Sequence, residues 1–173
     1  MHTQGVGPNS LATYGIGTNT RGLGPAVSDP AVLAGFTGVE PGLDTDELFE
    51  FTQQVDDRAE TAGVYTWAAE TYDAVIITAL ASEIAGIDEP SAVAEQIVDV
   101  TRGGVPCSSF LECRELAIGG EDIAYVGQGG GYVLTDTGDP TEAGYRVVRY
   151  AGATAPDPGR DEYRFFAALT IDG

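Results

Sequence analysis

Cys107 and Cys113 are the residues of this chain whose type and spacing carry the clearest chemical meaning. They are its only two cysteines, and five residues separate them. This spacing fits none of the usual zinc or redox motifs, so the two sulfurs predict either a disulfide or a pair of buried free thiols. A disulfide would be a structural staple, and it would indicate an oxidising compartment because cytosolic proteins keep their thiols reduced.

The segment between the cysteines also encodes the start of a helix. Ser109, followed three residues later by Glu112, is a capping box in which a hydroxyl and a carboxylate satisfy backbone N–H groups that lack partners inside the helix. A disulfide across this first turn would close a small loop, and we expect it to stabilise the fold by roughly 2 kcal/mol on the loop-entropy account.

Catalytic constellations cannot be assembled from the remaining residues. The single histidine is His2, so neither a Ser-His-Asp triad nor a histidine-based metal site can form within the chain. The glycine-rich run 127–131 lacks the Lys-Ser/Thr of a phosphate loop, and Asp136, Asp139 and Glu142 lack the order of a calcium loop and predict a turn. We therefore expect no catalytic residue, no metal and no cofactor. Hydrolysis by a pair of carboxylates is the enzymatic alternative.

The acidic composition limits the class of partner. The chain has 27 Asp and Glu residues against eight basic residues, all arginine, and its net charge is -19 over 173 residues. Nucleic acids and anionic membrane surfaces are bound through cationic patches, so both are excluded as partners. The charge fits an extracytoplasmic or a high-salt setting. The first residues, 1–5, have neither the basic nor the apolar region of a signal peptide, so we expect any export signal to have been removed.

Four segments have the hydrophobic spacing or the caps of helices. The clearest is 68–85, where apolar residues recur at helical spacing and Gly86 supplies a stop. The others are an acidic stretch over 44–58, a helix that begins near Pro90, and the capped helix after Ser109.

Short apolar runs between turn residues predict strands. One is 33–39, and a second pair, 131–135 and 145–150, flanks a turn at 137–140 and predicts a β-hairpin. The run 165–171 predicts an edge strand. Helices that alternate with strands and end in a hairpin predict the α/β class, and the length allows a real core.

Four sequence motifs carry a resemblance to a known family. In chain order they are Trp67-Ala68-Ala69-Glu70-Thr71-Tyr72-Asp73-Ala74-Val75, Val100-Thr101-Arg102-Gly103-Gly104 running into the cysteine segment, Gly120-Glu121-Asp122-Ile123, and Gly138-Asp139-Pro140-Thr141. Together they resemble the type I periplasmic solute-binding proteins of ABC importers, especially the branched-chain amino-acid-binding family. The resemblance spans about residues 14–150 and covers only the carboxyl-terminal half of such proteins.

The resemblance implies a two-lobe, three-layer α/β fold that holds its solute in the cleft. It assigns residues 1–39 to the end of the second lobe, 40–119 to the helical part of the first lobe, and 120–173 to the return into the second lobe with the β-hairpin and a tail. Most of the first lobe's sheet is then missing, and apolar helix faces lack the surface that covers them in the family. We expect an excised piece, a partner chain that supplies the amino-terminal half, or a rearranged compact fold.

The resemblance also implies binding residues. Trp67 matches an aromatic that lines the pocket of relatives that bind branched-chain amino acids, and packing at a helix start is its alternative role. The segment 14–19 matches a strand-to-loop that often presents a carboxylate to the ligand's ammonium, yet no acid occurs there. Because a buried ammonium without an anion is costly, we expect Thr18, Asn19 and Arg21 to bind an amide-like or acidic solute.

These features predict an extracytoplasmic solute-binding component or fragment, either periplasmic or a cell-surface lipoprotein. It would close its cleft around a small polar solute such as an amino acid or an amide, and deliver it to an ABC permease without bond chemistry. The alternative is a truncated interaction or sensor module that pairs with another chain and has no role in transport.

Overall fold

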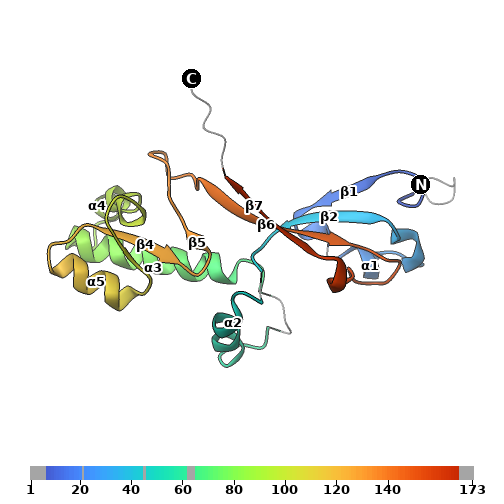
Figure 1. Ribbon diagram of the computed structural model, residues 1–173, viewed down its shortest axis with the longest axis horizontal. Coiled ribbons are helices and arrows are strands. Elements are labelled where there is room, and N and C mark those ends of the chain that lie inside the picture. The colour runs from blue at the N-terminus through green and yellow to red at the C-terminus, as the bar shows by residue number, and fades with distance from the viewer. Residues whose placement is uncertain (1–6, 21, 45, 62–64, 168–173) are drawn as a thin grey trace, which may run out of the picture. The chain divides into compact units, whose positions relative to one another are not determined.

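The computed structural model of this chain describes residues 7–20, 22–44, 46–61 and 65–167 (Figure 1). Helices and strands are both present, and each sheet combines parallel and antiparallel strand pairs, so the chain belongs to the mixed α/β class. In the part of the chain so described, no helix is long and apolar enough to cross a membrane.

The chain divides into two compact units. Unit 1 comprises residues 1–44 and 144–165, and unit 2 comprises residues 45–143 and 166–173. Residues 120–143, which we expected in the return to the second lobe, lie in unit 2, where the strand over 123–127 pairs with the strand over 105–107.

Unit 1 is built on a four-stranded mixed sheet of order β1-β2-β6-β7. Its strands are β1 (Thr13–Ile16), β2 (Phe36–Pro41), β6 (Glu142–Arg149) and β7 (Glu162–Ala167). β1 runs parallel to β2, and β6 joins the other side of β2 antiparallel. The connection from β1 to β2 contains α1 (Leu23–Ala26) between two 3₁₀ helices, and a third precedes β7: η2 (Gly17–Thr20), η3 (Pro30–Leu33) and η5 (Pro158–Arg160).

The core of unit 1 lies where one face of this sheet packs against the β1–β2 connection. Phe36 and Tyr150 pack edge to face with their ring centroids 5.8 Å apart, and Leu33 lies beside them. Leu23 and Val27 cover the cluster from α1 and its end. Side chains alternate along β2, so every second residue points into this core.

Unit 2 places helices against a three-stranded sheet of order β3-β4-β5. β3 (Val105–Cys107) and β4 (Ile123–Gly127) are parallel and are joined through α5 (Phe110–Ile118), and β5 (Gly130–Gly131) turns back along β4. The other elements are α2 (Phe49–Asp56), α3 (Ala68–Ala85), α4 (Pro90–Gln96) and the 3₁₀ helix η4 (Asp99–Thr101).

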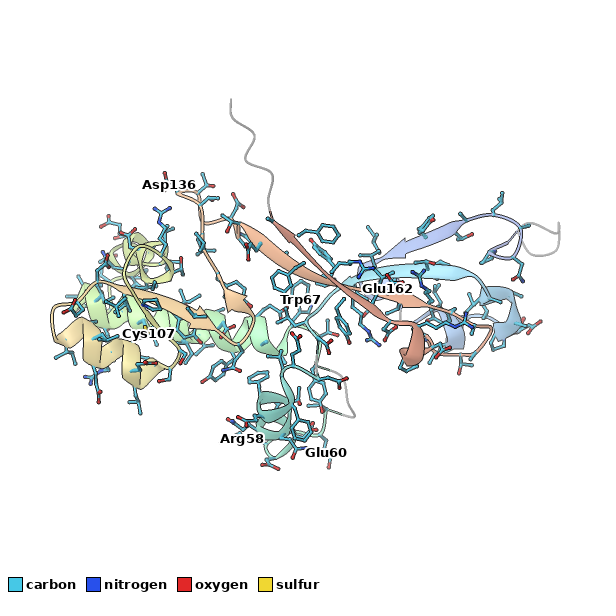
Figure 2. The ribbon with its side chains drawn as sticks, viewed as in Figure 1. Arg58, Glu60, Trp67, Cys107, Asp136 and Glu162 are labelled. Carbon is cyan, nitrogen blue, oxygen red and sulfur yellow. A yellow bond between two sulfur atoms is a disulfide. The ribbon has the colours of Figure 1, made fainter. Side chains whose placement is uncertain are left out.

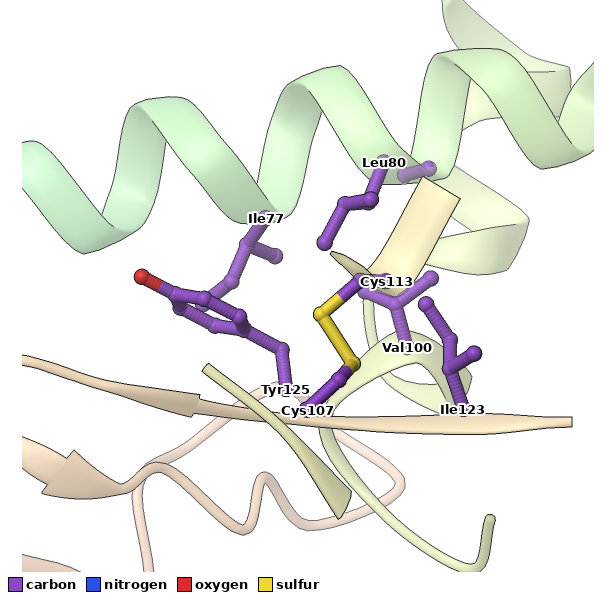
Figure 3. Close-up of a cluster of buried hydrophobic side chains, with 8 residues drawn as sticks. Ile77, Leu80, Val100, Cys107, Cys113, Ile123 and Tyr125 are labelled. Atoms are coloured by element: carbon purple, nitrogen blue, oxygen red, sulfur yellow. A yellow bond between two sulfur atoms is a disulfide. The ribbon is translucent and has the colours of Figure 1, made fainter. Parts of the chain in front are cut away.

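The disulfide between Cys107 and Cys113 lies inside the core of unit 2, which confirms the predicted staple. Both residues are almost fully buried, and the bond joins β3 to α5. Figure 3 shows it packed against side chains of α3 and β4, among them Ile77, Leu80 and Ile123.

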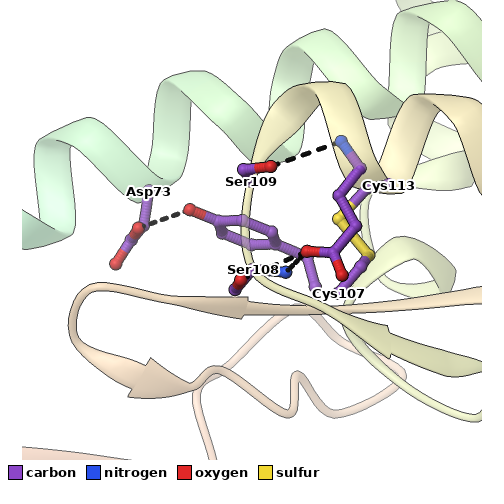
Figure 4. Close-up of a disulfide and its surroundings, with 7 residues drawn as sticks. Asp73, Cys107, Ser108, Ser109 and Cys113 are labelled. Carbon is purple, nitrogen blue, oxygen red and sulfur yellow. Dashed lines mark hydrogen bonds between the residues drawn. A yellow bond between two sulfur atoms is a disulfide. The ribbon is translucent and has the colours of Figure 1, made fainter.

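The ends of α3 and α5 follow the predicted signals. The Ser109 hydroxyl accepts the Glu112 N–H at 3.3 Å, and the Glu112 carboxylate accepts the Ser108 N–H at 2.8 Å (Figure 4). The carboxylate thus reaches one residue further back than in a standard capping box. α3 spans the predicted residues and ends at Gly86, whose φ of 67° is a conformation that glycine adopts without strain.

The predicted hairpin between 131–135 and 145–150 is wrong in its pairing. The turn forms, since the Thr135 N–H donates to the Asp139 carbonyl at 2.8 Å and the Thr141 N–H donates to the Val133 carbonyl at 3.0 Å. Beyond the turn, however, β6 pairs with β2. Val148 of β6 becomes fully buried there, and this burial against a distant strand is not encoded in a local turn.

Other elements differ from the predictions in their bounds. The helix predicted over 44–58 is limited to α2, and β2 starts three residues later than expected. Leu33 instead ends a 3₁₀ helix, which Pro30 opens and in which the Asp29 carboxylate accepts the Ala31 N–H at 3.0 Å, and Ala34 and Gly35 form a turn. β7 is the predicted edge strand but begins earlier, and residues 168–171 lie outside the described part.

Candidate functional site

Trp67 begins α3 in a strained backbone conformation. Its φ of 65° and ψ of 7° place it in the left-handed region, where it is the only non-glycine residue with a positive φ among those the structure describes. For a bulky residue this conformation costs roughly 1–2 kcal/mol, so it persists only where its surroundings hold it. The side chain is 50% exposed at the start of α3 (Figure 2). Because strained residues cluster at functional sites, this strained and half-exposed aromatic residue is a candidate binding residue.

Polar groups without partners adjoin Trp67. The Trp67 carbonyl accepts the Thr71 N–H at 2.9 Å, but the Trp67 side chain makes no hydrogen bond to the N–H groups of the first turn. Such a helix start favours a carbonyl or an anion as partner. The hydroxyl oxygen of Thr66, the preceding residue, is buried and has no hydrogen-bond partner among the described residues.

Asp73, further along α3, is a fully buried carboxylate that accepts three hydrogen bonds. Oδ1 accepts from the Tyr125 hydroxyl at 2.8 Å (Figure 4). Oδ1 also accepts from the Gln128 N–H at 2.9 Å, and Oδ2 accepts from the Gly129 N–H at 2.9 Å. These bonds tie α3 to the glycine-rich turn between β4 and β5. Gly127 must lack a side chain, because a Cβ there would lie 2.3 Å from the Asp73 Cγ.

Burial and the negative charge of Asp73 raise the pKa values of three neighbouring residues. Burial and the hydrogen bond to Asp73 raise the pKa of the Tyr125 phenol far above its usual range. Burial, and then the charge of Asp73, raise the pKa of Tyr132 in the same direction. Its hydroxyl oxygen is buried and makes no hydrogen bond of ordinary geometry within the described part. Burial, together with the charge of Asp73, also raises the pKa of Glu70.

We call Thr66, Trp67, Glu70, Asp73 and Tyr132 the Trp67 site. Buried polar groups in folded proteins nearly always have partners, and the buried Thr66 hydroxyl has none among the described residues. An aromatic ring can cover the face of a small molecule, and the carboxylates favour cationic or hydrogen-bond-donating groups. The arrangement is therefore suited to binding a small polar molecule.

The other predicted binding residues lie in unit 1. Thr18 and Asn19 belong to η2, directly after β1, as the strand-to-loop resemblance implies. Their side chains, and the whole of Arg21, lie outside the described residues. The predicted residues are therefore divided between the units, with Trp67 in unit 2.

Glu40 supplies this loop of unit 1 with a carboxylate that the sequence prediction missed. It lies on β2 and is buried, and its Oε1 lies 2.8 Å from the Thr20 hydroxyl oxygen, which also lies 2.9 Å from the Gly17 carbonyl. The Tyr150 hydroxyl donates to the Thr20 carbonyl. The signal in the sequence was the alternation of side chains along a strand, which places every second residue of β2, including Glu40, on the core face.

The sequence prediction also missed Asp73 and its tyrosine partners. Asp73 falls on the same helical stripe as Ala69 and Ile77, so an acid on the core face of an apolar helix was the available signal. Within the described ranges, no three His, Cys, Asp or Glu side chains gather as a metal ion would require.

Comparison with known proteins identifies no relative. No family model matches the chain, and neither a curated protein nor a solved structure matches it. The resemblance to periplasmic binding proteins therefore stays a prediction that rests on the four sequence motifs.

Proposed function

We propose that this chain is a solute-recognition module of the type I periplasmic-binding-protein kind, which binds a small polar solute and passes it to an ABC permease. The observation that carries the proposal is the exposed, strained Trp67 at the start of α3, where it supplies no side-chain cap, next to the buried and unpaired hydroxyl of Thr66. The division into two units, between which the chain passes near residues 44, 143 and 165, supports it as well. The disulfide fits the oxidising compartment in which such modules act.

The charges of the Trp67 site favour a solute with an ammonium group or amide N–H donors. Glu70 is a partly buried carboxylate whose pKa is raised by burial, and a bound cation would offset the cost of keeping it ionised. It would supply the anion that segment 14–21 lacks, so an amino acid stays within the proposed solute class alongside amides.

We keep Thr18, Asn19 and Arg21 as proposed solute contacts, on the strength of the sequence resemblance alone. The solute is held by hydrogen bonds and by contact with the indole ring, and no bond is made or broken.

Isothermal titration calorimetry of the chain against amino acids, their amides and small carboxylates tests this proposal. We expect saturable binding to at least one of these classes. Trp67→Ala and Thr18→Ala should each weaken the affinity about tenfold or more, equivalent to roughly 1.4 kcal/mol. Phe49→Ala, which removes an aromatic side chain 62% exposed on α2, is the matched control and should leave the affinity unchanged. Unchanged affinity in both test variants would place the pocket elsewhere, and absence of binding across the panel would contradict the proposal.

A second candidate is an interaction or sensor module that pairs with another chain. It is favoured by the exposed apolar residues of α3, such as Val75, which is 63% exposed. A monodisperse monomer of 18.0 kDa under all solution conditions would count against it.

A further inference from the structure

Glu70 is the carboxylate of the Trp67 site that is not sealed in the core. It lies in the first turn of α3, three residues after Trp67, and it is only partly buried. Asp73, one turn further on, is fully buried and accepts its three hydrogen bonds from uncharged groups of the protein. A solute at this site would therefore contact Glu70 directly, and it would feel Asp73 through the charge of that residue alone.

No positive charge compensates these two carboxylates among the described residues of unit 2. The arginines of unit 2 all donate to groups outside the Trp67 site, in the pairs Arg58–Gln54, Arg102–Asp136 and Arg114–Glu83. Burial, and then the charges of Asp73 and Glu70, raise the pKa of Tyr132, so this neighbour responds to the uncompensated negative charge. Carboxylates taken out of water are normally paired, and this site lacks the cation that would pair with them.

The start of α3 does not require an anion from the solute. The Ala68 N–H donates to the Tyr65 carbonyl at 3.0 Å, and the Glu70 carboxylate lies close to its own backbone N–H. Glu70 is thus itself the anion that the positive end of the helix dipole favours. A solute carboxylate placed here would face Glu70 with no cation between them, and two like charges in contact repel.

The groups beside Glu70 are suited to an ammonium group. The Trp67 side chain is 50% exposed, and the face of an indole ring attracts cations more strongly than that of any other aromatic side chain. The Thr66 hydroxyl is buried and has no partner among the described residues, and its oxygen can accept an N–H group. An ammonium group can contact the ring face while its N–H groups donate to the carboxylate and the hydroxyl.

We propose that the solute of the Trp67 site is a small organic cation, with an ammonium group and no carboxylate. The proposal rests on the proposed function and narrows its solute class. Amino acids and small carboxylates carry a negative charge that finds no partner in the described part of the site, and neutral amides leave the charge of Glu70 uncompensated. The net charge of -19 adds to this preference, because the field of the chain draws cations towards it.

Calorimetric titration with one side chain in three charge forms tests the proposal. The forms are leucine, a zwitterion, leucinamide, a cation, and N-acetyl-leucinamide, which is neutral; glycine and phenylalanine supply the same three forms. A pH of about 6.5 keeps the amine charged, since α-amino groups have pKa values of about 7.7–8.0. In at least one series the cation should bind about tenfold more tightly than the other two forms. Salt at about 1 M should weaken its binding.

Glu70→Gln removes the charge of the side chain and keeps its shape. It should lower the affinity for the cation about tenfold and leave the affinity for the neutral form unchanged, a difference that a merely structural role would not produce. Glu115→Gln, which neutralises an exposed acid on α5, is the matched control and should change neither affinity. Far-UV circular dichroism shows whether the variants are folded. Should Glu70→Gln fail to fold, the ranking of the three forms by the parent chain decides.

The outcomes separate this proposal from the proposed function. A zwitterion or a neutral form that binds as tightly as the cation would overturn the proposal and leave solute recognition standing. A preference for the zwitterion would indicate that a cation such as Arg21 completes the site. Cation binding that Glu70→Gln does not weaken would also overturn the proposal. If no form of any series binds, solute recognition itself is contradicted, and this proposal with it.

Discussion

The disulfide between Cys107 and Cys113 joins β3 to α5 within a cluster of buried side chains. We expect its reduction to lower the free energy of unfolding of unit 2 by about 2 kcal/mol, because the unfolded chain then regains the entropy of the open loop. Urea unfolding with and without a reducing agent measures the difference. The double variant Cys107→Ala, Cys113→Ala should not respond to the reductant. An unchanged midpoint for the parent chain would mean that the bond adds nothing to stability.

Glu70 should make the stability of unit 2 depend on pH, and the direction of this dependence follows from its raised pKa. Burial raises its pKa above 4.5 in the folded state, so the folded protein holds the proton more tightly than the unfolded chain. The stability that it contributes is therefore complete below the unfolded pKa and is lost as the pH rises through the folded pKa. Glu70→Gln should be more stable than the parent at about pH 7 and equally stable at about pH 3.

Thermal melts at the two pH values measure this effect. Glu115→Gln, which neutralises an exposed acid on α5, is the control and should not show the same difference. A Glu70→Gln variant that is less stable than the parent at neutral pH, or that keeps its gain in acid, would contradict the assignment.

Between elements, Asp73 is the tie that holds α3 to the turn between β4 and β5. Asp73→Ala would leave the Tyr125 hydroxyl and two backbone N–H groups unpaired, and each such group costs roughly 1–3 kcal/mol. Gly127→Ala would force a Cβ against the same carboxylate. Both variants should therefore unfold at lower urea than the parent.

Gly22→Ala is the matched control for Gly127→Ala. No atom lies within 4 Å of the Cβ that it would add, and its φ of -84° suits alanine. Should Gly127→Ala be tolerated as well as Gly22→Ala, the turn would not be held against Asp73 as described.

The helices were predictable from the sequence because their signals are local. Apolar spacing and Gly86 marked α3, and the capping box marked α5. The pairing of β6 with β2 was not predictable, since it joins segments about a hundred residues apart in the chain and depends on burial in a shared core. β3 and β4 were missed because short strands carry little periodicity.

The candidate site was predictable only in part, for the same reason. Trp67 was predicted through its motif and stays a predicted binding residue, and its strain is visible only in the folded backbone. The link between Asp73 and Gly129 joins residues far apart in the sequence, so it required the tertiary structure. Glu40 reaches Thr20 across neighbouring elements of unit 1 and was hidden in the same way.

At the scale of the whole molecule, the two units differ in charge. Unit 1 carries six acidic residues and five arginines, whereas unit 2 carries most of the acidic residues of the chain. Like charges within unit 2 repel one another, and salt screens that repulsion.

The fluorescence of Trp67 offers the most direct test of solute recognition. It is the only tryptophan of the chain, so its emission reports on the proposed site without a label. Titration with amino acids, amides and small carboxylates should change that emission saturably for at least one solute, with a midpoint equal to the calorimetric Kd. Emission that stays constant across the whole panel, in a chain that circular dichroism shows to be folded, would contradict solute recognition at Trp67.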